Sequence, residues 1–327
     1  MRLFQVRFFA VFILFSVFIS VAVADEYPTR PVTLIAPYGP GGAADAHARI
    51  IAATATGYLG QSLQVINKTG AGGVVGSSYV VRSKKDGYTL LSARVGSQAS
   101  VPAVNPEIPY KWDDFTFLGL TERNPFVLIV PINSKYKNFA EIASAIKSGE
   151  ELSFSSAGKG TLLHLASQIM ADSLGVDGKN LIHVPYKGGG KARSAVVLGK
   201  VDMLWQNLSG VIELIREGKV RALAITTKKR VSAISDVPTV SELGYPKMET
   251  IIGWSGIFGP PDLPKPIADK WIQILAKLKS DKEFNKSIAA LGSIPDIRNP
   301  EETRIFVKSQ YQAFRAVARK LNMGNAQ

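Results

Sequence analysis

The chain has 327 residues, a net charge of +13 and no cysteine. The lack of cysteine excludes disulfides, a lipid-anchored N-terminal cysteine, thiol catalysis and zinc–thiolate sites. The positive charge favours acidic partners, but the basic residues are dispersed apart from Lys84-Lys85 and Lys228-Lys229-Arg230, so no nucleic-acid interface is expected.

An export signal is expected at the N-terminus. Arg2 and Arg7 precede an uncharged, almost wholly apolar run over residues 8–24, and Ala22-Val23-Ala24 fits a small-residue cleavage site. We therefore predict a signal peptide over residues 1–24, cleaved after Ala24. The alternative is an uncleaved membrane anchor, because the run is at the lower limit of length for crossing a bilayer.

Strand-like and helix-like segments alternate along the rest of the chain, which is typical of an α/β fold. Strands are expected at residues 32–36, 63–66, 88–92, 152–155, 181–185, 203–206 and 222–226. Helices are expected at residues 45–59, 74–84, 140–148, 161–174, 192–199, 266–280, 282–290 and 300–321. The last helix is amphipathic. The residues expected to bury against the first lobe are Ile305, Phe306, Tyr311, Phe314, Ala318 and Leu321.

Two lobes are expected, because about 300 residues exceed what one core usually serves. Extended segments at 119–131 and 248–258 can carry the chain to the second lobe and back, which makes a hinge of two crossing segments. We therefore predict two mixed, mostly parallel sheets, with residues 25–122 and 250–327 in lobe 1 and residues 123–249 in lobe 2.

Two glycine-rich turns each lie between an expected strand and an expected helix. The first runs from Pro37 to Asp45 and the second from Ser156 to Thr161. A glycine turn that opens a helix leaves backbone N–H groups without partners, and the helix dipole adds partial positive charge, so such a turn can receive a phosphate or a carboxylate. Two such turns, far apart in the sequence, predict two lobes that close on one acidic small molecule.

Catalytic and cofactor motifs are weak or missing. The glycines from Gly70 to Gly76 resemble a dinucleotide fingerprint, but the next strand ends without the acidic ribose ligand, so a structural turn is preferred. No nucleotide-phosphate loop or Gly-X-Ser-X-Gly elbow occurs, and His47, His164 and His183 are not at metal-ligand spacing. The sequence therefore favours binding without chemistry, with no cofactor and no metal.

Three side chains near the turns each have two interpretations. Asp45 can cap the first helix or face the ligand, and capping is preferred because an acid would repel an anion. Thr161 can cap its helix and also donate its hydroxyl to a ligand. His164 can face the cleft, but packing or capping is preferred. A third glycine turn, Gly188-Gly189-Gly190, is flanked by lysines that can attract anions.

Several motifs together match one family over nearly the whole mature chain. They include Pro37-Tyr38-Gly39-Pro40-Gly41-Gly42, Asn67-Lys68-Thr69-Gly70, Asp86-Gly87-Tyr88-Thr89, Gly158-Lys159-Gly160-Thr161, Val184-Pro185-Tyr186-Lys187-Gly188 and Trp254-Ser255-Gly256. The chain resembles the periplasmic solute-binding receptors of tripartite tricarboxylate transporters, the Bug family. This resemblance implies a Venus-flytrap, periplasmic-binding-protein-like fold and a periplasmic location.

The resemblance also implies how a ligand carboxylate is bound, through backbone N–H groups and water at the two turns. Carried over, the amides are those of Gly41, Gly42 and Ala43 on one lobe and of Gly158, Gly160 and Thr161 on the other. Together with the turn and cleft positions beside them, the predicted ligand-binding residues are Tyr38, Gly41, Gly42, Ala43, Arg94, Ser156, Gly158, Gly160, Thr161, His164, Gln206 and Asn207.

Three positions depart from the family pattern. Gln206 stands where many relatives have an acid, which suits a more acidic or a neutral ligand. Ala44 removes a hydroxyl that relatives often have. The loop from Arg94 to Ser100 matches poorly and is expected to carry selectivity, with Arg94 either pairing a second carboxylate or lying on the surface. Tyr38, Trp205 and Trp254 are expected either to grip the ligand body or to belong to the core.

The predicted function is a monomeric receptor that captures a small carboxylated solute and delivers it to the membrane subunits of a secondary transporter. Two alternatives remain from the sequence. One is a receptor that presents its ligand to a membrane signalling protein. The other is an exported enzyme acting on an acidic metabolite, for which no base–nucleophile pair is visible.

Overall fold

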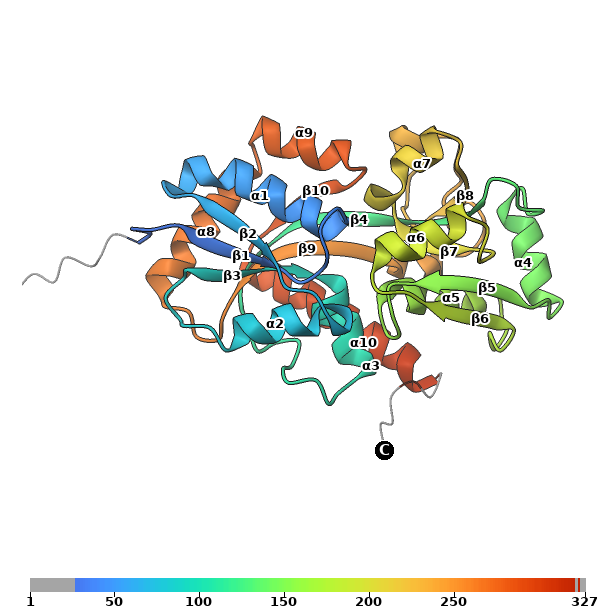
Figure 1. Ribbon diagram of the computed structural model, residues 1–327, viewed down its shortest axis with the longest axis horizontal. Coiled ribbons are helices and arrows are strands. Elements are labelled where there is room, and N and C mark those ends of the chain that lie inside the picture. The colour runs from blue at the N-terminus through green and yellow to red at the C-terminus, as the bar shows by residue number, and fades with distance from the viewer. Residues whose placement is uncertain (1–26, 321–322, 324–327) are drawn as a thin grey trace, which may run out of the picture.

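The computed structural model describes residues 27–320 and residue 323. The predicted signal peptide and its cleavage site lie outside these residues. Within them, no helix is long and apolar enough to cross a membrane. Figure 1 shows two lobes side by side, joined by long strands that run from one lobe into the other.

The sheet of lobe 1 has the strand order β10-β4-β9-β3-β1-β2. β1 pairs in parallel with β2 and β3, whereas β9 pairs antiparallel with both β3 and β4, and β10 pairs antiparallel with β4. The strands are β1 Val32–Ala36, β2 Leu63–Asn67, β3 Thr89–Arg94, β4 Thr116–Pro131, β9 Ile252–Gly259 and β10 Ile294–Arg298.

Lobe 2 is built on the far end of the same long strand. β7 and β8 pair antiparallel with the C-terminal half of β4, and β5 and β6 form a separate parallel pair. A parallel bridge from Phe154 to Met203 links that pair to the segment before β7. The strands are β5 Leu152–Ser156, β6 Leu181–Pro185, β7 Leu204–Asn207 and β8 Val220–Ile225.

The two crossing segments are β4 and β9, so the expected hinge is present. The two lobes share β4, so eight strands of both lobes form one connected sheet, beside the two-stranded sheet of β5 and β6 in lobe 2. The sheets are mixed, and the parallel pairs lie within each lobe. The crossing strands pair antiparallel, because one carries the chain out of lobe 1 and the other brings it back, and this makes the fold less parallel than expected.

Helices cover both faces of each lobe. In lobe 1, α1, α8 and α9 pack together on one face, and α10 packs with α3 on the other (Figure 1). The helices of lobe 1 are α1 Ala43–Leu59, α2 Val74–Val81, α3 Val101–Val104, α8 Lys265–Leu278, α9 Lys282–Ala290 and α10 Pro300–Lys320. Those of lobe 2 are α4 Phe139–Lys147, α5 Leu162–Ser173, α6 Gly189–Val197 and α7 Ile212–Arg216.

The buried face of α10 agrees only in part with the one expected. Phe314 and Ala318 are buried as expected, together with Val307, whereas Ile305 is 61% exposed and Leu321 lies outside the described residues. Thr303 fixes this orientation, because its hydroxyl accepts the backbone N–H of Leu120 in β4 (2.8 Å). A buried hydrogen bond to the sheet thus determines the rotation of the helix, which its hydrophobic pattern alone left open.

Candidate ligand-binding site

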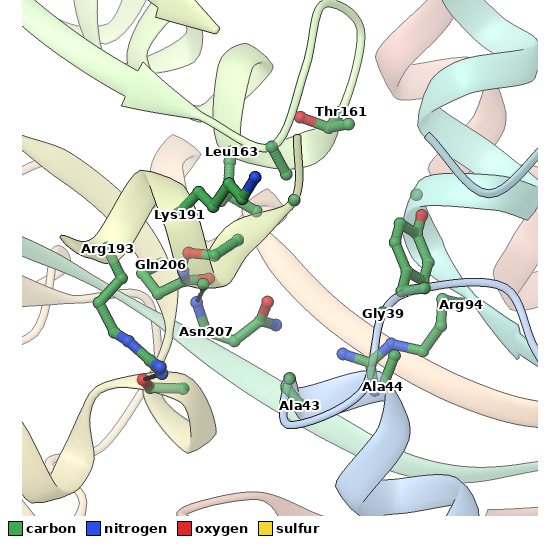
Figure 2. A pocket seen from close by; sticks show the side chains of 18 of the residues that line it. Gly39, Ala43, Ala44, Arg94, Thr161, Leu163, Lys191, Arg193, Gln206 and Asn207 are labelled. Atoms are coloured by element: carbon green, nitrogen blue, oxygen red, sulfur yellow. Dashed lines mark hydrogen bonds between the residues drawn. The ribbon is translucent and has the colours of Figure 1, made fainter. Parts of the chain in front are cut away.

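A cavity of about 490 Å³ lies between the lobes. Lobe 1 contributes the first glycine turn, the start of α1 and the end of β3. Lobe 2 contributes the starts of α5 and α6 and the end of β7. In Figure 2, Ala43 lies across the cavity from Thr161 and Leu163, and Gln206 and Asn207 lie on the lobe 2 wall. A cavity of this size suits a small organic ligand.

Asp45 stabilises the first glycine turn from within. Its Oδ2 accepts the backbone N–H of Gly41 (3.0 Å) and the Nε–H of Arg49 (3.0 Å), and its Oδ1 accepts the side-chain amide of Asn67 (2.9 Å). Burial raises the pKa of this carboxyl, but these hydrogen bonds outweigh burial and lower it below the ordinary value. Asp45 therefore braces the turn, as preferred from the sequence, and the amide of Gly41 is already used.

Tyr38 forms part of the cavity wall without offering its hydroxyl to a ligand. The hydroxyl donates to the carbonyl of Gly72 (2.8 Å), and burial raises the pKa of Tyr38 to about 12. A Cβ at Gly96 would lie 2.2 Å from this hydroxyl, and one at Gly73 3.1 Å from it. Gly73, one of the glycines that resemble a dinucleotide fingerprint, thus makes room for a tyrosine, which agrees with a structural turn.

The second glycine turn also uses its own amides. The N–H of Gly158 donates to Ser156 Oγ (3.1 Å), and the N–H of Gly160 donates to His164 Nδ1 (3.1 Å). The hydroxyl of Thr161 donates to the carbonyl of Gly158 (2.8 Å). These groups fix the turn, so the direct contacts with a ligand that the family resemblance implied for Gly158 and Gly160 do not fit this arrangement.

His164 packs inside lobe 2 and does not line the cavity. Its ring stacks on His183 with centroids 4.0 Å apart, and both rings stack on Phe154. Burial, with the neighbouring charge of His183, lowers the pKa of His164 to about 3. The ring is therefore neutral near pH 7 and accepts the turn amide through Nδ1. This position agrees with packing rather than with a place in the cleft, although His164 was also among the predicted ligand-binding residues.

Seven backbone N–H groups at three helix starts line the cavity. Within the described chain, none of the seven has a protein acceptor. They belong to Ala43 and Ala44 in α1, Leu162 and Leu163 in α5, and Gly189, Gly190 and Lys191 in α6. The first amides of any helix lack intrahelical partners and carry the positive end of the helix dipole. Three such ends meeting in one cavity favour an anionic ligand.

The charged side chains that line the cavity are all basic. They are Arg94, Lys187, Lys191 and Arg193, and none of the described lining residues is an acid. Arg193 donates one Nη1–H to the carbonyl of Gly210. No ion pair is found within the described residues for Lys187 or Lys191, which are both exposed. The potential in the cavity is therefore positive, which favours binding of anions.

Arg94 already has an anionic partner. It is only 5% exposed, and its Nη1 donates to Glu122 Oε1 (2.9 Å) and to Ser255 Oγ. Burial raises the pKa of Glu122, but the nearby His47 and Arg94 and the hydroxyl of Ser255 together lower it below the ordinary value. Arg94 thus lies at the cavity wall but not on the surface, and its charge is largely neutralised by Glu122.

Gln206 and Asn207 both lie at the cavity, at the end of β7. Gln206 donates through Nε2 to the carbonyl of Gly189 (3.1 Å) and so attaches the start of α6 to β7. Asn207 is 8% exposed, and its Nδ2 has no hydrogen-bond partner in the described chain. Gln206 therefore acts mainly on the backbone, whereas Asn207 has a free donor.

Of the predicted site residues, eight line the cavity. These are Tyr38, Gly41, Gly42, Ala43, Arg94, Thr161, Gln206 and Asn207, whereas Ser156, Gly158, Gly160 and His164 support the second turn from behind. Trp205 and Trp254 are fully buried core residues, and Phe126 is the aromatic residue that joins Tyr38 in the wall. Sequence reasoning did not single out Phe126, Leu162, Leu163 or Arg193, whose positions depend on how the lobes meet.

The cavity does not suit a metal ion. No group of three or more His, Asp or Glu side chains that could bind a metal occurs among the residues that the structure describes. The available groups are backbone N–H donors and cationic side chains, which are the wrong chemistry for a cation.

Comparison with known proteins decides the family. The family model described as "Tripartite tricarboxylate transporter family receptor" matches residues 47–323. The chain belongs to this receptor family. BugT of Bordetella pertussis is similar to this receptor, with 32% identity over 300 residues that make up 91% of each chain.

Two solved structures support the fold of this receptor. A protein of R. palustris solved with adipate is 28% identical, has a TM-score of 0.85 and covers 91% of this chain and 99% of its own. MatC of Rhodopseudomonas palustris, solved with bound malate, is 29% identical, has a TM-score of 0.82 and covers 89% of this chain and 100% of its own. The receptor thus has the two-lobed periplasmic-binding-protein fold.

Proposed function

We propose that the mature receptor captures a small carboxylated solute in the cavity between its lobes and delivers it to the membrane subunits of a tripartite tricarboxylate-type transporter. The observation that carries this proposal is the lining of the cavity, where free helix-start amides and basic side chains converge without an acid. The malate and adipate of the two solved relatives support the same ligand class. The solute is bound without chemical change.

The site residues act together in this proposal. The carboxylate lies between the starts of α1 and α5 and accepts the free amides of Ala43, Ala44, Leu162 and Leu163. Internal hydrogen bonds preorganise both turns, so little conformational entropy is lost on binding. Four charge-assisted hydrogen bonds contribute about 6–12 kcal/mol before the cost of association, about 4–15 kcal/mol, is subtracted. Enclosure of the ligand body by Tyr38 and Phe126 adds the remainder.

Export and partner recognition complete the proposal. The signal peptide over residues 1–24 directs the chain to the periplasm, where residues 25–122 and 250–327 form lobe 1 and residues 123–249 form lobe 2. The receptor acts as a monomer. Because β4 and β9 both cross between the lobes, closure around the solute changes the surface that a membrane subunit contacts, and only the loaded receptor then has the matching shape.

The test measures binding by the mature chain after unfolding and refolding, which removes any ligand carried through purification. Isothermal titration is run with mono-, di- and tricarboxylates and with uncharged amides of the same length. We expect saturable binding of a carboxylate class and no binding of the matching amides. Conversion of a panel member to product, or binding of the amides alone, would overturn the proposal.

The variant that tests the free amides at the helix starts is Ala43→Pro. Ala43 is the first residue of α1, where proline is tolerated, and the preceding Gly42 has the extended backbone (ψ 170°) that a following proline requires. The variant therefore removes one free N–H without breaking the helix. We expect a ten- to hundredfold weaker affinity for the carboxylate, corresponding to one charge-assisted hydrogen bond of about 1.5–3 kcal/mol, with little change in melting temperature.

A further inference from the structure

A second hollow, of about 900 Å³, lies where the two lobes meet and is separate from the solute cavity. Lobe 2 lines it with residues 226–233, which follow β8, and with part of the segment Pro246–Thr250 before β9. Lobe 1 lines it with the start of β10 and with Phe306 and Gln310 of α10. The hollow and the solute cavity have no lining residue in common. We call this hollow the hinge groove.

The hinge groove and the solute cavity lie on opposite faces of β4. Glu122 and Arg123 are consecutive in this strand, and successive side chains of a strand point to opposite faces. Glu122 pairs with Arg94, which lines the cavity, whereas Arg123 lines the groove. Bending about β4 and β9 that narrows the cavity therefore widens the groove behind it.

The hinge groove is more basic than the chain as a whole. Five of its 21 lining residues are lysine or arginine and one is an acid, whereas the chain has 39 basic and 26 acidic residues among 327. Lys228 and Lys229 are exposed and have no ion pair within the described residues. The arginines are paired with acids, Arg123 and Arg298 with Asp296 and Arg230 with Glu242. The two lysines are therefore available to an acidic partner.

The other groups in the hinge groove suit a peptide better than a small ion. Ile252 is 9% exposed, and Ile294 and Phe306 are half-buried, so apolar surface lies beside the lysines. The backbone N–H groups of residues 228–230 have no acceptor within the described chain. An extended segment can place apolar side chains on this surface, acidic side chains near the lysines and its own carbonyls near these amides.

We propose that the hinge groove is the surface on which an acidic, extended segment of the membrane subunit docks. This inference rests on the proposed function and adds where the membrane subunit binds and how it recognises the loaded receptor. Closure around the solute widens the groove, so the segment and the solute favour the same conformation. Each therefore raises the affinity for the other by the same factor.

The probe is a synthetic peptide of about ten residues in which glutamate and leucine alternate, so that the acids lie on one face of an extended chain. Its counterpart has glutamine in place of glutamate. Binding to the refolded mature chain is measured by fluorescence anisotropy at moderate salt. We expect the acidic peptide to bind saturably and at least tenfold more tightly than its counterpart. Equal displacement of the peptide by inorganic phosphate at the same concentration of charge would show a general anion site and overturn the docking surface.

The double variant Lys228→Gln/Lys229→Gln removes the two unpaired charges, and Lys84→Gln/Lys85→Gln is its matched control. Both are pairs of adjacent, exposed lysines, and each double change lowers the net charge by the same amount. We expect the groove variant to bind the acidic peptide about five- to tenfold more weakly, and the control to stay within about twofold of the original. Equal weakening in both would show that net charge alone attracts the peptide, which would overturn the proposal.

A second pair of variants blocks the groove without changing its charge. Ser232 and Ser235 are both exposed in the segment after β8, but only Ser232 lines the groove. We expect Ser232→Trp to weaken binding of the acidic peptide at least fivefold and Ser235→Trp to leave it unchanged. Affinity for the carboxylate should not fall in either variant, because both positions lie outside the solute cavity. Unchanged peptide binding in Ser232→Trp would place the peptide elsewhere and overturn the proposal.

Peptide titrations with and without the carboxylate separate this inference from the proposed function. We expect a saturating carboxylate to tighten peptide binding at least threefold, and the peptide to tighten carboxylate binding by the same factor. If the peptide binds equally tightly in both titrations, or competes with the carboxylate, the docking surface is overturned while the receptor remains. If no carboxylate binds, the proposed function itself fails, whatever the peptide does.

Discussion

Each wall of the cavity has a glycine turn that hydrogen bonds to nearby side chains hold in place, but the bonding groups differ between the two lobes. In lobe 1 the glycine turn is braced by an ionised acid, Asp45, whose charge is balanced by Arg49. In lobe 2 the corresponding turn is braced by neutral groups, the hydroxyls of Ser156 and Thr161 and the ring of His164. In both walls turn amides, those of Gly41, Gly158 and Gly160, are bonded internally, and the first helix amides have no acceptor within the described chain. In the proposed function the glycine turns are therefore supports, and the helix starts behind them bind the solute.

Loss of the acidic brace should have the largest effect on stability. Asp45 accepts from three donors with its two oxygens, and an asparagine would point an N–H₂ group at one of these donors. We expect Asp45→Asn to lower the free energy of unfolding by about 2–3 kcal/mol, measured by urea titration. Asp177→Asn, at an exposed ion pair, is the control and should change stability by less than about 0.5 kcal/mol. Equal effects of the two changes would contradict the bracing role.

Acid should destabilise both lobes through one buried histidine in each. Burial lowers the pKa of His47 to about 4 and that of His164 to about 3, and the ordinary value is 6.5. Below pH 6.5 the unfolded chain takes up protons that the folded chain does not, so stability falls as the pH drops. Between pH 7 and pH 5.5 we expect a loss of roughly 1 kcal/mol from each histidine.

Urea titrations at several pH values check this prediction. His47→Gln and His164→Gln should each remove a similar share of the pH dependence over this range, and part of the remainder comes from His183, whose pKa burial also lowers. His47 lies in α1 with its ring bonded to Ser92 and Thr121, and the two histidines share no partner, so their effects should add. An unchanged pH dependence in both variants would show that other groups control it.

The prediction with the smallest expected effect tests whether the hydroxyl of Thr161 supports the turn of lobe 2 or binds the ligand. The hydroxyl of Thr161 donates to the carbonyl of Gly158, so it is not available to a solute. We expect Thr161→Val to cost about 1 kcal/mol of stability and to leave carboxylate affinity within twofold of the original. Thermal unfolding and calorimetry check the two parts. A large loss of affinity without loss of stability would assign the hydroxyl to the ligand instead.

The local pattern of the chain predicted most of the fold. Apolar strands followed by glycine turns and amphipathic helices identified α1, α5 and most strands to within a few residues, because turn and helix-start chemistry act over short distances. The pattern did not show that residues 116–131 form one strand shared by both lobes. It also missed β10 and the buried helical segment after Arg94, whose burial depends on packing against α10.

The sequence by itself determined that two glycine turns open helices on two lobes and that the chain carries an excess of positive charge. The acceptors that take up the amides of Gly41, Gly158 and Gly160 lie within four residues of them, so these bonds too are local. Only the tertiary structure decided which helix starts meet at one cavity. It also decided that Arg94 is paired with Glu122 and that α6 enters the cavity. The pairing of Arg94 with Glu122 and the meeting of three helix starts depend on residues far apart in the chain, whereas the turns, the helix starts and the hydrogen bonds within them depend on neighbours.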